Sequence, residues 1–507
     1  LSTQREYTYS LGNVGYAISQ SHFSYDSANR VTEQRYKSTY SGGGTATGPR
    51  YYRYTYSNTD GSLTKLTHSY FDLNYSYDGL KRLGSRTLKK DGTALLTRNY
   101  TYTAGAGTNG ASFLVSKVES RDKNSNVLRS YTYTYDDNGN ITAVSGSDAA
   151  AYTYDGQNQL LSETKGGVTT SFTYDAAGNI LTRTKGGVTD TYTYGDSEWK
   201  DLLTAYNNHT ITYDAIGNPT AWYDGSSFTW SYGRKLTGIT NGSTSISYSY
   251  YADGRRLSKT VGSTTTTFNW VGDMLFSTYQ NDGTTFEFLY DESGHPAGFW
   301  YKQGSGDWNL YFYVTNLQGD ITKIIDEDGS SIGTYSYDAW GKVTSVSGTI
   351  AQANPLRYRG YYYDEETGFY QLGSRYYDPE IGRFVSADDA DVITEDPFEI
   401  TDKNLFAYCD NNPVLHIDRE GEFWDEVTEL GKAIMRGGIM IAGTAVAIAG
   451  GAVVVGSVIA TGGASAAAIA GVLSETAFIA METSAGCMIV GSGITLLGVG
   501  KRLPKRN

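Results

Sequence analysis

Aromatic and small polar residues alternate along the middle of the chain. Tyr131, Tyr133 and Tyr135 are separated by single threonines, and Phe172 and Tyr174 flank another threonine further on. A period of two places the rings on one face of a β-strand and the hydroxyl side chains on the other. The pattern therefore predicts short strands that each have one aromatic face.

A recurrent turn separates these strands. It has Asp at its start and Gly three positions later, as in Asp175 and Gly178, and an apolar residue such as Ile180 opens the return strand. The Asp side chain can bond the backbone two residues on, and Gly can adopt a positive φ. Each unit is thus a predicted β-hairpin. The anchoring tyrosines, spaced by 19 or 20 residues, are Tyr135, Tyr154, Tyr174, Tyr194, Tyr213 and Tyr232, and weaker copies are found at Tyr25, Tyr77, Tyr290 and Tyr337.

A single hairpin of this kind cannot bury its aromatic face. Successive units must therefore pair edge to edge. Adjacent strands twist by roughly 20–25°, and closure removes the exposed edges of a sheet. We expect a mainly β protein in which one long antiparallel sheet spirals into a shell. Most of the rings are expected to be structural, because burying each one removes about 150–250 Å² from water.

Composition narrows the class of protein further. The 507 residues include 45 tyrosines and 60 glycines but only 8 prolines, which is typical of sheet with many turns. Such a length exceeds the ~250–300 residues that a single core supports. The chain begins at Leu1, so we expect a piece of a longer protein. The net charge of −13 and the scattered basic residues argue against nucleic-acid binding.

Cysteine and histidine are too sparse for the usual metal sites. The two cysteines, Cys409 and Cys487, lie far apart, and no two of the five histidines have the spacing of a zinc motif. The sequence therefore predicts neither a disulfide framework nor a bound metal or cofactor.

Residues 356–388 differ from the rest of the chain, because aromatic, charged and glycine residues are all dense there. The segment closely resembles the Rhs-associated core motif, and the Tyr-Asp repeats before it resemble those of Rhs proteins, teneurins and the C components of bacterial Tc toxins. The matching residues of the core motif are Arg357–Gly360, Tyr363–Asp364, Thr367–Tyr370, Arg375–Pro379 and Gly382–Phe384.

This resemblance implies an architecture and a function. Residues 1–355 would form part of a hollow β-cocoon, residues 356–422 a core plug, and residues 423–507 a variable C-terminal region. The implied function is that of a bacterial polymorphic toxin, secreted or displayed on the cell surface, whose shell encloses and delivers its own C-terminal segment. An immunity protein or a capping protein would be its partner.

The resemblance also implies self-cleavage just after the core. The carried-over residues are Arg383, Asp388 and Asp418, and the cut is expected after Glu422. Two neighbouring carboxylates can act as acid and base on water, and an arginine can hold one of them charged. The chain would then be an aspartyl-type autoprotease that acts once on itself.

The family pattern is not matched throughout this region. Ala387 and Asp389 replace two prolines, Arg419 replaces a third, and Glu422 stands where an apolar residue is usual. Residues 389–402 form an acidic insertion. The alternative interpretation is that Asp388 and Asp418 only form turns and that the core does not cut.

The tail changes character from residue 423, where tyrosine disappears. Residues 437–474 and 483–500 carry no charge, and basic residues follow at 501–506. Residues 425–436 suit a short amphipathic helix, and the first uncharged run exceeds the ~20 residues of a membrane span. Three interpretations of the tail remain open. It could be a helical segment that inserts into a membrane through 437–500, a hydrophobic helical segment stored inside the shell, or a soluble helical core.

A second function of a different class is also consistent with the sequence. The chain could be a non-enzymatic surface adhesin whose Tyr-rich repeats bind carbohydrate and whose hydrophobic tail anchors it. Self-cleavage separates the two hypotheses, because only the first predicts a released C-terminal fragment.

Overall fold

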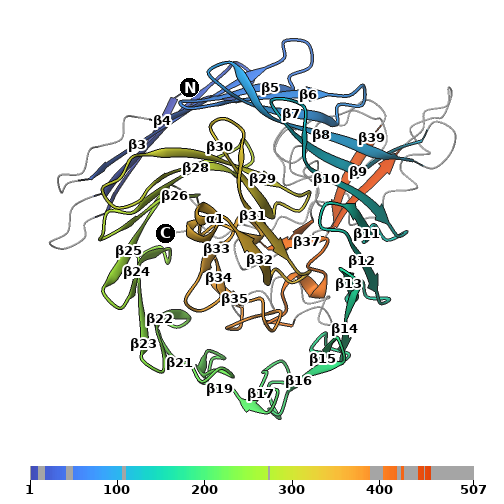
Figure 1. Ribbon diagram of the computed structural model, residues 1–507, viewed down its shortest axis with the longest axis vertical. Helices are drawn as coiled ribbons and strands as arrows, with labels where there is room; N and C mark the ends of the chain where they lie inside the picture. Colours follow the sequence, from blue (N-terminus) through green and yellow to red (C-terminus); the bar gives the residue numbers. More distant parts are fainter. Residues whose placement is uncertain are drawn as a thin grey trace, which may run out of the picture. The chain divides into compact units, whose positions relative to one another are not determined.

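The computed structural model describes residues 2–9, 17–40, 50–105, 110–271, 274–388, 404–418, 424–426, 444–449 and 452–457. The chain divides into two compact units, Leu1–Leu430 and Gly431–Asn507. The first unit is mainly β, as predicted, and contains every residue of the candidate site (Figure 1).

The first unit begins with a sheet of 18 described strands in which each strand pairs antiparallel with the next along the chain. Such pairing of consecutive hairpins is the arrangement that the repeat predicts. The strands are β1 (Ser2–Tyr9), β2 (Ala17–Tyr25), β3 (Val31–Tyr40), β4 (Arg50–Tyr56), β5 (Leu63–His68), β6 (Asp72–Tyr77), β7 (Leu83–Lys90), β8 (Thr93–Ala104), β9 (Ala111–Asp122), β10 (Val127–Tyr135), β11 (Ile141–Gly146), β12 (Ala150–Tyr154), β13 (Leu160–Lys165), β14 (Val168–Tyr174), β15 (Ile180–Lys185), β16 (Val188–Thr193), β17 (Ala205–Tyr206) and β18 (His209–Thr210).

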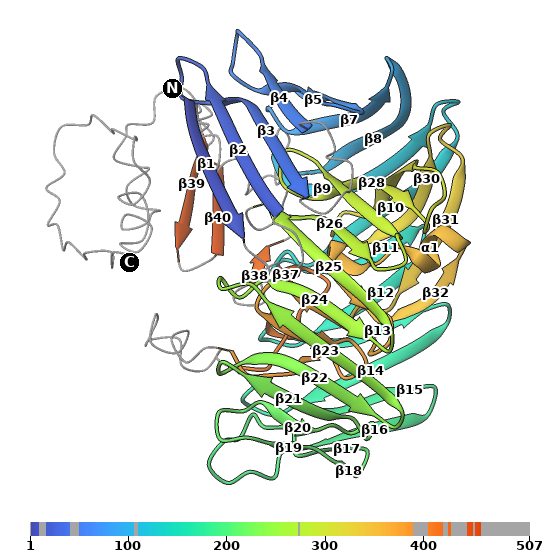
Figure 2. The ribbon, with the colours of Figure 1, turned by 90° about the vertical axis from the view of Figure 1, so that its left-hand side faces the viewer.

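A second sheet of 14 described strands continues the same order. Figure 2 shows its green strands following one another as neighbours. The strands are β19 (Thr212–Tyr213), β20 (Pro219–Ala221), β21 (Ser227–Ser231), β22 (Lys235–Asn241), β23 (Thr244–Tyr250), β24 (Arg256–Val261), β25 (Thr264–Val271), β26 (Met274–Gln280), β27 (Thr285–Tyr290), β28 (Pro296–Lys302), β29 (Asn309–Thr315), β30 (Ile321–Asp326), β31 (Ser331–Tyr337) and β32 (Val343–Ser347).

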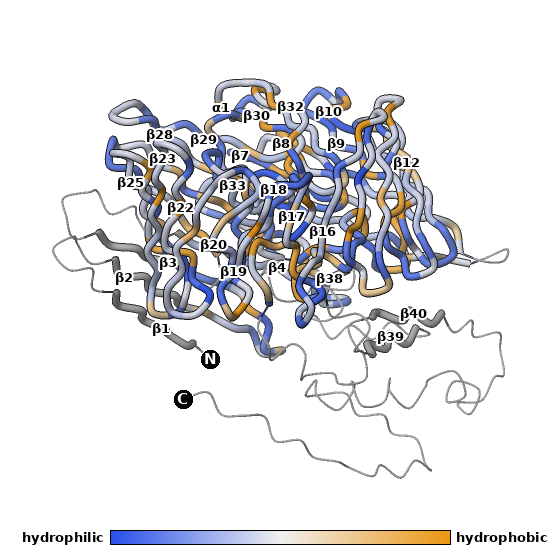
Figure 3. The backbone as a smooth tube through the Cα atoms, turned by 90° about the horizontal axis from the view of Figure 1, so that it is seen from below, coloured by the Kyte–Doolittle hydropathy of each residue, from blue (hydrophilic) through white to orange (hydrophobic). Residues whose placement is uncertain are grey.

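The alternation along each strand sorts side chains as predicted. Tyr131 and Tyr133 are buried, while Thr132 and Thr134, at the alternate positions, are exposed. The hydropathy of the chain accordingly changes over short distances along the strands (Figure 3). The turn chemistry is also confirmed, because Asp175 Oδ1 accepts the backbone N–H of Ala177 at 2.9 Å and Gly178 has a φ of 74°.

The repeated tyrosine does more than fill the core. In three repeats its hydroxyl donates to the backbone carbonyl of the residue that opens the previous return strand: Tyr154 to Ile141 at 2.7 Å, Tyr174 to Leu160 at 2.6 Å and Tyr194 to Ile180 at 3.0 Å. A β-bulge falls at the same tyrosine, for example between Thr173 and Tyr174. Bulges increase strand twist. The tyrosine thus fastens each repeat to its predecessor at the point where the sheet turns.

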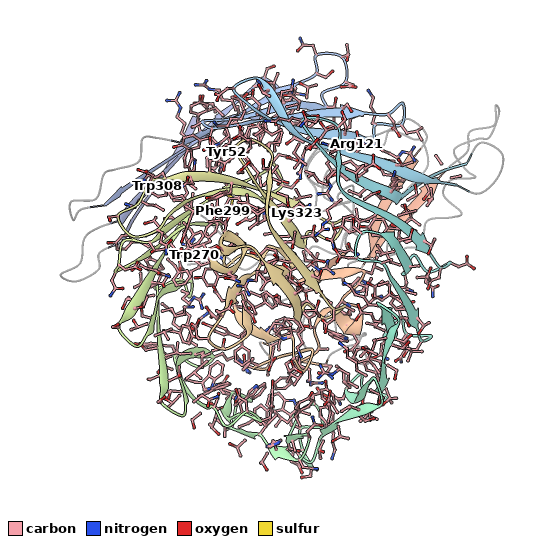
Figure 4. All side chains as sticks on the ribbon, viewed as in Figure 1. Tyr52, Arg121, Trp270, Phe299, Trp308 and Lys323 are labelled. Carbon is pink, nitrogen blue, oxygen red and sulfur yellow. The ribbon has the colours of Figure 1, made fainter. Side chains whose placement is uncertain are left out.

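The two sheets face each other across part of the first unit. Tyr52 of β4 lies between them and accepts the backbone N–H of Tyr290, whereas Trp308 and Arg121 lie towards the outside (Figure 4). Further along, Arg98 of β8 donates to Thr315 Oγ1 at 2.7 Å and to the Asn316 carbonyl at 2.8 Å. Side chains therefore join strands that are more than 200 residues apart in sequence.

Residues 356–388 and 404–418, called the core segment below, lie inside the curve of the two sheets (Figure 1). Helix α1 (Thr349–Ala353) leads into the segment, and a four-stranded sheet forms its first part. The elements are η1 (Tyr358–Gly360), β33 (Tyr362–Asp364), β34 (Phe369–Leu372), β35 (Arg375–Asp378), β36 (Arg383–Phe384), η3 (Cys409–Asn411) and β37 (His416–Asp418).

Buried ion pairs attach the core segment to the second sheet. Arg256 of β24 is fully buried, its Nη1 lies 2.6 Å from Asp364 Oδ2, and Lys259 Nζ lies 2.8 Å from Asp364 Oδ1. The guanidinium of Arg256 also lies over the ring of Phe268 at 4.2 Å. A buried charge needs a close partner of this kind, because its transfer from water is costly.

The predicted helices of the tail are not observed where the structure describes this region. Residues 424–426 form β38 (Trp424–Glu426), which pairs with β37, so the helix predicted over 425–436 is wrong at its start. In the second unit, β39 (Thr444–Ala449) and β40 (Ala452–Ser457) pair as an antiparallel hairpin. The Gly450-Gly451 dipeptide between two Val- and Ile-containing runs is a hairpin signal, which explains the difference.

The rest of the tail, including most of 437–500, lies outside the described residues. Among the residues that the structure describes, no helix is both long and apolar enough to cross a membrane.

Candidate functional site

Two of the three predicted catalytic residues come together in the core segment. Asp388 and Asp418 share one arginine, Arg375, whose Nη2 lies 2.8 Å from Asp388 Oδ2 and 3.6 Å from Asp418 Oδ2. All three residues are buried. Two carboxylates that are 30 positions apart in sequence thus meet on one guanidinium.

Asp388, the first carboxylate, is held by Arg375 of strand β35 and by the backbone of Leu405. Arg375 opens β35, and its guanidinium stacks on the ring of Phe384 with the Cζ atom 3.5 Å from the ring centroid. Its Nη1 donates to the carbonyl of Leu405 at 3.0 Å. The backbone N–H of Asp388 donates to the same carbonyl at 3.0 Å. Leu405 therefore links the arginine to the backbone of its carboxylate partner.

The second carboxylate ends strand β37. Asp418 follows a tight turn in which Cys409, Asp410 and Asn411 all have positive φ values of 52°, 49° and 60°. The backbone N–H of His416 donates to the Asn412 carbonyl at 3.0 Å, and the Tyr361 hydroxyl donates to the carbonyl of Asp418 itself. The turn and the tyrosine together hold the backbone that leads up to and includes Asp418.

Burial controls the titration of the groups around Asp418. It raises the pKa of the Cys409 thiol well above its usual range, so the sulfur stays protonated. It lowers the pKa of His416 to about 4, so the imidazole is neutral at pH 7. Neither group is therefore suited to act as a thiolate nucleophile or as an imidazolium acid, which leaves the two carboxylates as the candidate acid–base groups.

Arg383, the third predicted residue, lies elsewhere. It donates to the hydroxyl of Tyr194 at 2.9 Å and to the carbonyl of Asp201 at 2.9 Å, and its Nη1 also lies 3.3 Å from Asn179 Oδ1. These contacts join the core segment to the first sheet. The arginine of the carboxylate pair is Arg375, which the sequence identifies only as a matching residue of the core motif.

Two further expectations fall outside the described residues. The predicted cut after Glu422 lies beyond Asp418, where the description of the chain is interrupted, and the acidic insertion 389–402 follows Asp388. As for a metal, no group of three or more His, Cys, Asp or Glu side chains in the described ranges is arranged to hold one.

Comparison with known proteins places these features in a family. The teneurin YD-shell family model matches residues 114–197 and 274–414, which include β10–β16, β26–β32 and most of the core segment. Over 243 residues, or 46% of the chain, the sequence is 35% identical to the tRNA nuclease WapA of Bacillus subtilis. It is 33% identical over 117 residues, or 23% of the chain, to the toxin protein Tse5 of Pseudomonas aeruginosa. These matches cover only 10% and 8% of the two relatives, respectively.

Solved structures show the same fold. A TcdB2–TccC3–Cdc42 crystal structure aligns with a TM-score of 0.56 at 19% identity, over 83% of this chain and 25% of that chain. The Tc holotoxin pore of Photorhabdus luminescens aligns with the same TM-score over 80% of this chain and 24% of that chain, at 18% identity. The repeat turns, the consecutive antiparallel strands and these matches together show that the chain belongs to the Rhs/YD-repeat family.

Proposed function

We propose that the chain is part of a toxin-delivery shell that cuts its own backbone once, after the core segment. The observation that carries the proposal is the convergence of Asp388 and Asp418 on Arg375. The relatives support the delivery part, because WapA is named as a nuclease and Tse5 as a toxin. The protein would then act outside the cell that makes it, or inside a cell to which it is delivered.

The distances of the two carboxylates from Arg375 suggest a different catalytic role for each. Arg375 lies closer to Asp388, and a nearby cation favours the ionised form of a carboxylate. Asp388 would then act as the base that takes a proton from water, and Asp418 as the acid that protonates the leaving amide nitrogen. The water oxygen bonds to the scissile carbonyl carbon, the C–N bond breaks, and the products are a carboxylic acid and an amine.

The proposed product is a C-terminal segment that starts at residue 423. It would be the enclosed cargo, and an immunity protein for it and membrane contact through 437–500 are further expectations of the same proposal. The adhesin alternative has less support, because the repeated tyrosine rings are largely occupied in the core and in backbone hydrogen bonds rather than presented for carbohydrate.

A denaturing gel of the purified chain tests the proposal. Cleavage after Glu422 releases 85 of 507 residues of a 55.3 kDa chain, or about 9 kDa. Mass spectrometry of the fragment should place its first residue at Phe423. A wild-type chain that stays intact after folding would refute the self-cleavage part of the proposal.

A matched pair of substitutions separates the chemistry from folding. Asp388→Asn removes one carboxylate of the site and should leave the chain uncut. Asp378→Asn is the control, since Asp378 is also buried on the core sheet but bonds Trp222 Nε1 at 3.2 Å and the Tyr223 hydroxyl at 3.0 Å. Asp378→Asn therefore removes a buried carboxyl of the core sheet, as Asp388→Asn does, but touches neither carboxylate of the pair. The control should still cut.

A further inference from the structure

The turns of the first sheet present side-chain amides to the core segment. In four repeats the residue before the return strand is an Asn or Gln, at most 6% exposed, whose side-chain nitrogen donates to the Asp of its own turn at 2.9 Å. That bond leaves the amide oxygen of each residue as an acceptor. Three of these residues lie in consecutive repeats of the first sheet and are called the turn amides below: Asn140, Gln159 and Asn179. Asn218 has the same position in a turn of the second sheet.

Three asparagines of the core segment donate to three consecutive turn amides. The order along the core segment is the reverse of the order along the sheet, so the segment runs antiparallel to the row of turns. The bonds run from Asn412 Nδ2 to Asn140 Oδ1 at 2.8 Å, from Asn411 Nδ2 to Gln159 Oε1 at 2.9 Å, and from Asn404 Nδ2 to Asn179 Oδ1 at 2.6 Å.

Each end of this row of bonds leads directly to one carboxylate of the site. Asn404 precedes Leu405, whose carbonyl accepts both Arg375 Nη1 and the backbone N–H of Asp388. At the other end, the Asn412 side chain accepts the backbone N–H of Leu415 at 3.2 Å, three residues before Asp418. The turn amides therefore contact the neighbours of the proposed catalytic groups rather than the groups themselves.

The backbone between the two ends is strained. Cys409, Asp410 and Asn411 occupy the left-handed region, which side chains with a Cβ disfavour. Such a conformation persists only where the surrounding contacts enforce it. The bonds from Asn411 to Gln159 and to the Gly178 carbonyl, at 2.7 Å, are contacts of this kind.

We infer that Asn140, Gln159 and Asn179 are positioning residues that set the register of the core segment on three successive repeats and so bring Asp388 and Asp418 onto Arg375. The inference rests on the proposed self-cleavage for its functional meaning. Its structural content, that the turn amides hold residues 404–418 in place, can be tested without any cleavage.

Asn218 provides a matched control for this inference. It has the same position in its repeat, is fully buried, and donates to Asp214 Oδ2 at 2.9 Å as Asn140 does to Asp136. In the part of the chain that the structure describes, its Oδ1 has no hydrogen-bond partner. An Asn218→Ala variant therefore loosens one turn without removing a bond to the core segment.

Hydrogen–deuterium exchange on the full chain tests the structural content. The measurement uses the Asp388→Asn background, so that every sample is uncut. Asn140→Ala should speed the exchange of amides in residues 404–418 by about tenfold, the upper end of the effect of one hydrogen bond, while Asn218→Ala leaves their exchange within about twofold. Equal protection in the two variants, or equal loss, would overturn the inference.

A double-mutant cycle on the active chain tests the link to cleavage. Fragment appearance is timed after pulse labelling in cell-free synthesis. Asn140→Ala and Asn412→Ala should each slow cleavage at least about threefold, and the double variant should be no slower than the worse single variant. Asn218→Ala should combine additively with Asn412→Ala, since these two side chains share no bond.

The two experiments test the positioning role and the proposed function independently. Additive behaviour of Asn140 and Asn412 would overturn the positioning role even if the chain cuts. A wild-type chain that never cuts would refute the proposed function, yet the exchange measurement would still decide whether the turn amides hold the core segment.

Discussion

Arg256 and Asp364 form an ion pair, with Nη1 and Oδ2 2.6 Å apart, in which neither side chain is exposed to solvent. The pair joins strand β24 of the second sheet to strand β33 of the core segment. It is stable because Lys259 adds a second cation to the same carboxylate and because aromatic rings surround the guanidinium.

Removing the carboxylate of this pair should be strongly destabilising. In an Asp364→Asn variant the buried guanidinium loses its charge partner, and we expect the free energy of unfolding to fall by about 3–5 kcal/mol. Urea unfolding followed by tryptophan fluorescence measures the change. Glu365→Gln is the control, because its partner Arg357 is buried but Glu365 itself is 71% exposed, and such pairs contribute at most about 1 kcal/mol.

The two arginines of the core should differ in their effect on cleavage. Arg375→Lys removes the guanidinium whose Nη2 contacts both carboxylates, and we expect at least a 100-fold slower cut, the scale of a lost acid–base arrangement. Arg383→Lys keeps a cation beside Tyr194 and should slow the cut far less. Timed gels of the two variants measure the difference, and a larger effect at Arg383 would contradict the assignment of Arg375.

The hydroxyl of the repeated tyrosine should contribute to stability independently of its ring. Tyr174→Phe leaves the Leu160 carbonyl without its donor, which costs about 1 kcal/mol or more. Tyr232→Phe is the control, because Tyr232 is 92% exposed. Comparison of the urea midpoints of the two variants measures the effect. Equal midpoints would mean that the ring alone matters.

The stability of the first unit should fall on acidification below pH 6.5, in part through His416. Burial lowers the pKa of this ring to about 4, compared with about 6.5 in an unfolded chain. Between these values the unfolded chain binds more protons, so acid favours unfolding in this window. His416→Gln should remove up to about 3 kcal/mol of this dependence, which unfolding curves from pH 4 to 7 would show.

Asp378 should have the opposite effect to His416 on the pH dependence of stability. Its pKa is raised to about 6 by burial, so between about pH 4 and 6 the folded chain binds the extra proton. Stability contributed by this carboxyl therefore grows on acidification. An Asp378→Asn variant should lose stability more steeply than the wild type as the pH falls, and a shallower loss would contradict the assigned sign.

The local structure of the repeat could be predicted from the sequence because its causes are local. Period-two aromatics and the Asp and Gly of each turn determine which face of a strand is buried and where the strand ends, as Tyr133 and Gly178 show. Asn140 and Asn179 are also repeated in the sequence, but their amides bond a segment more than 200 residues away. Their repetition after Gly was the available signal, and no local rule assigns it a partner.

In the candidate site, too, some features could be predicted from the sequence and others depend on the tertiary structure. The motif singled out Asp388 and Asp418, yet Arg375 and Arg383 both lie in it, and only the tertiary path of the chain distinguishes them. In the tail, composition could not decide between helix and strand for residues 444–449 and 452–457, and the pairing of β39 with β40 does.

The direction of the tyrosine bond has a consequence for how the chain is made. In the repeats from Tyr135 to Tyr213 the tyrosine hydroxyl bonds a carbonyl that precedes it in the chain, as Tyr194 does to Ile180. A repeat can therefore be completed as soon as it leaves the ribosome, without waiting for later sequence. Folding can proceed from the N-terminal side during synthesis. The core segment is translated after the strands that surround it, so it would pack against sheets that have already formed.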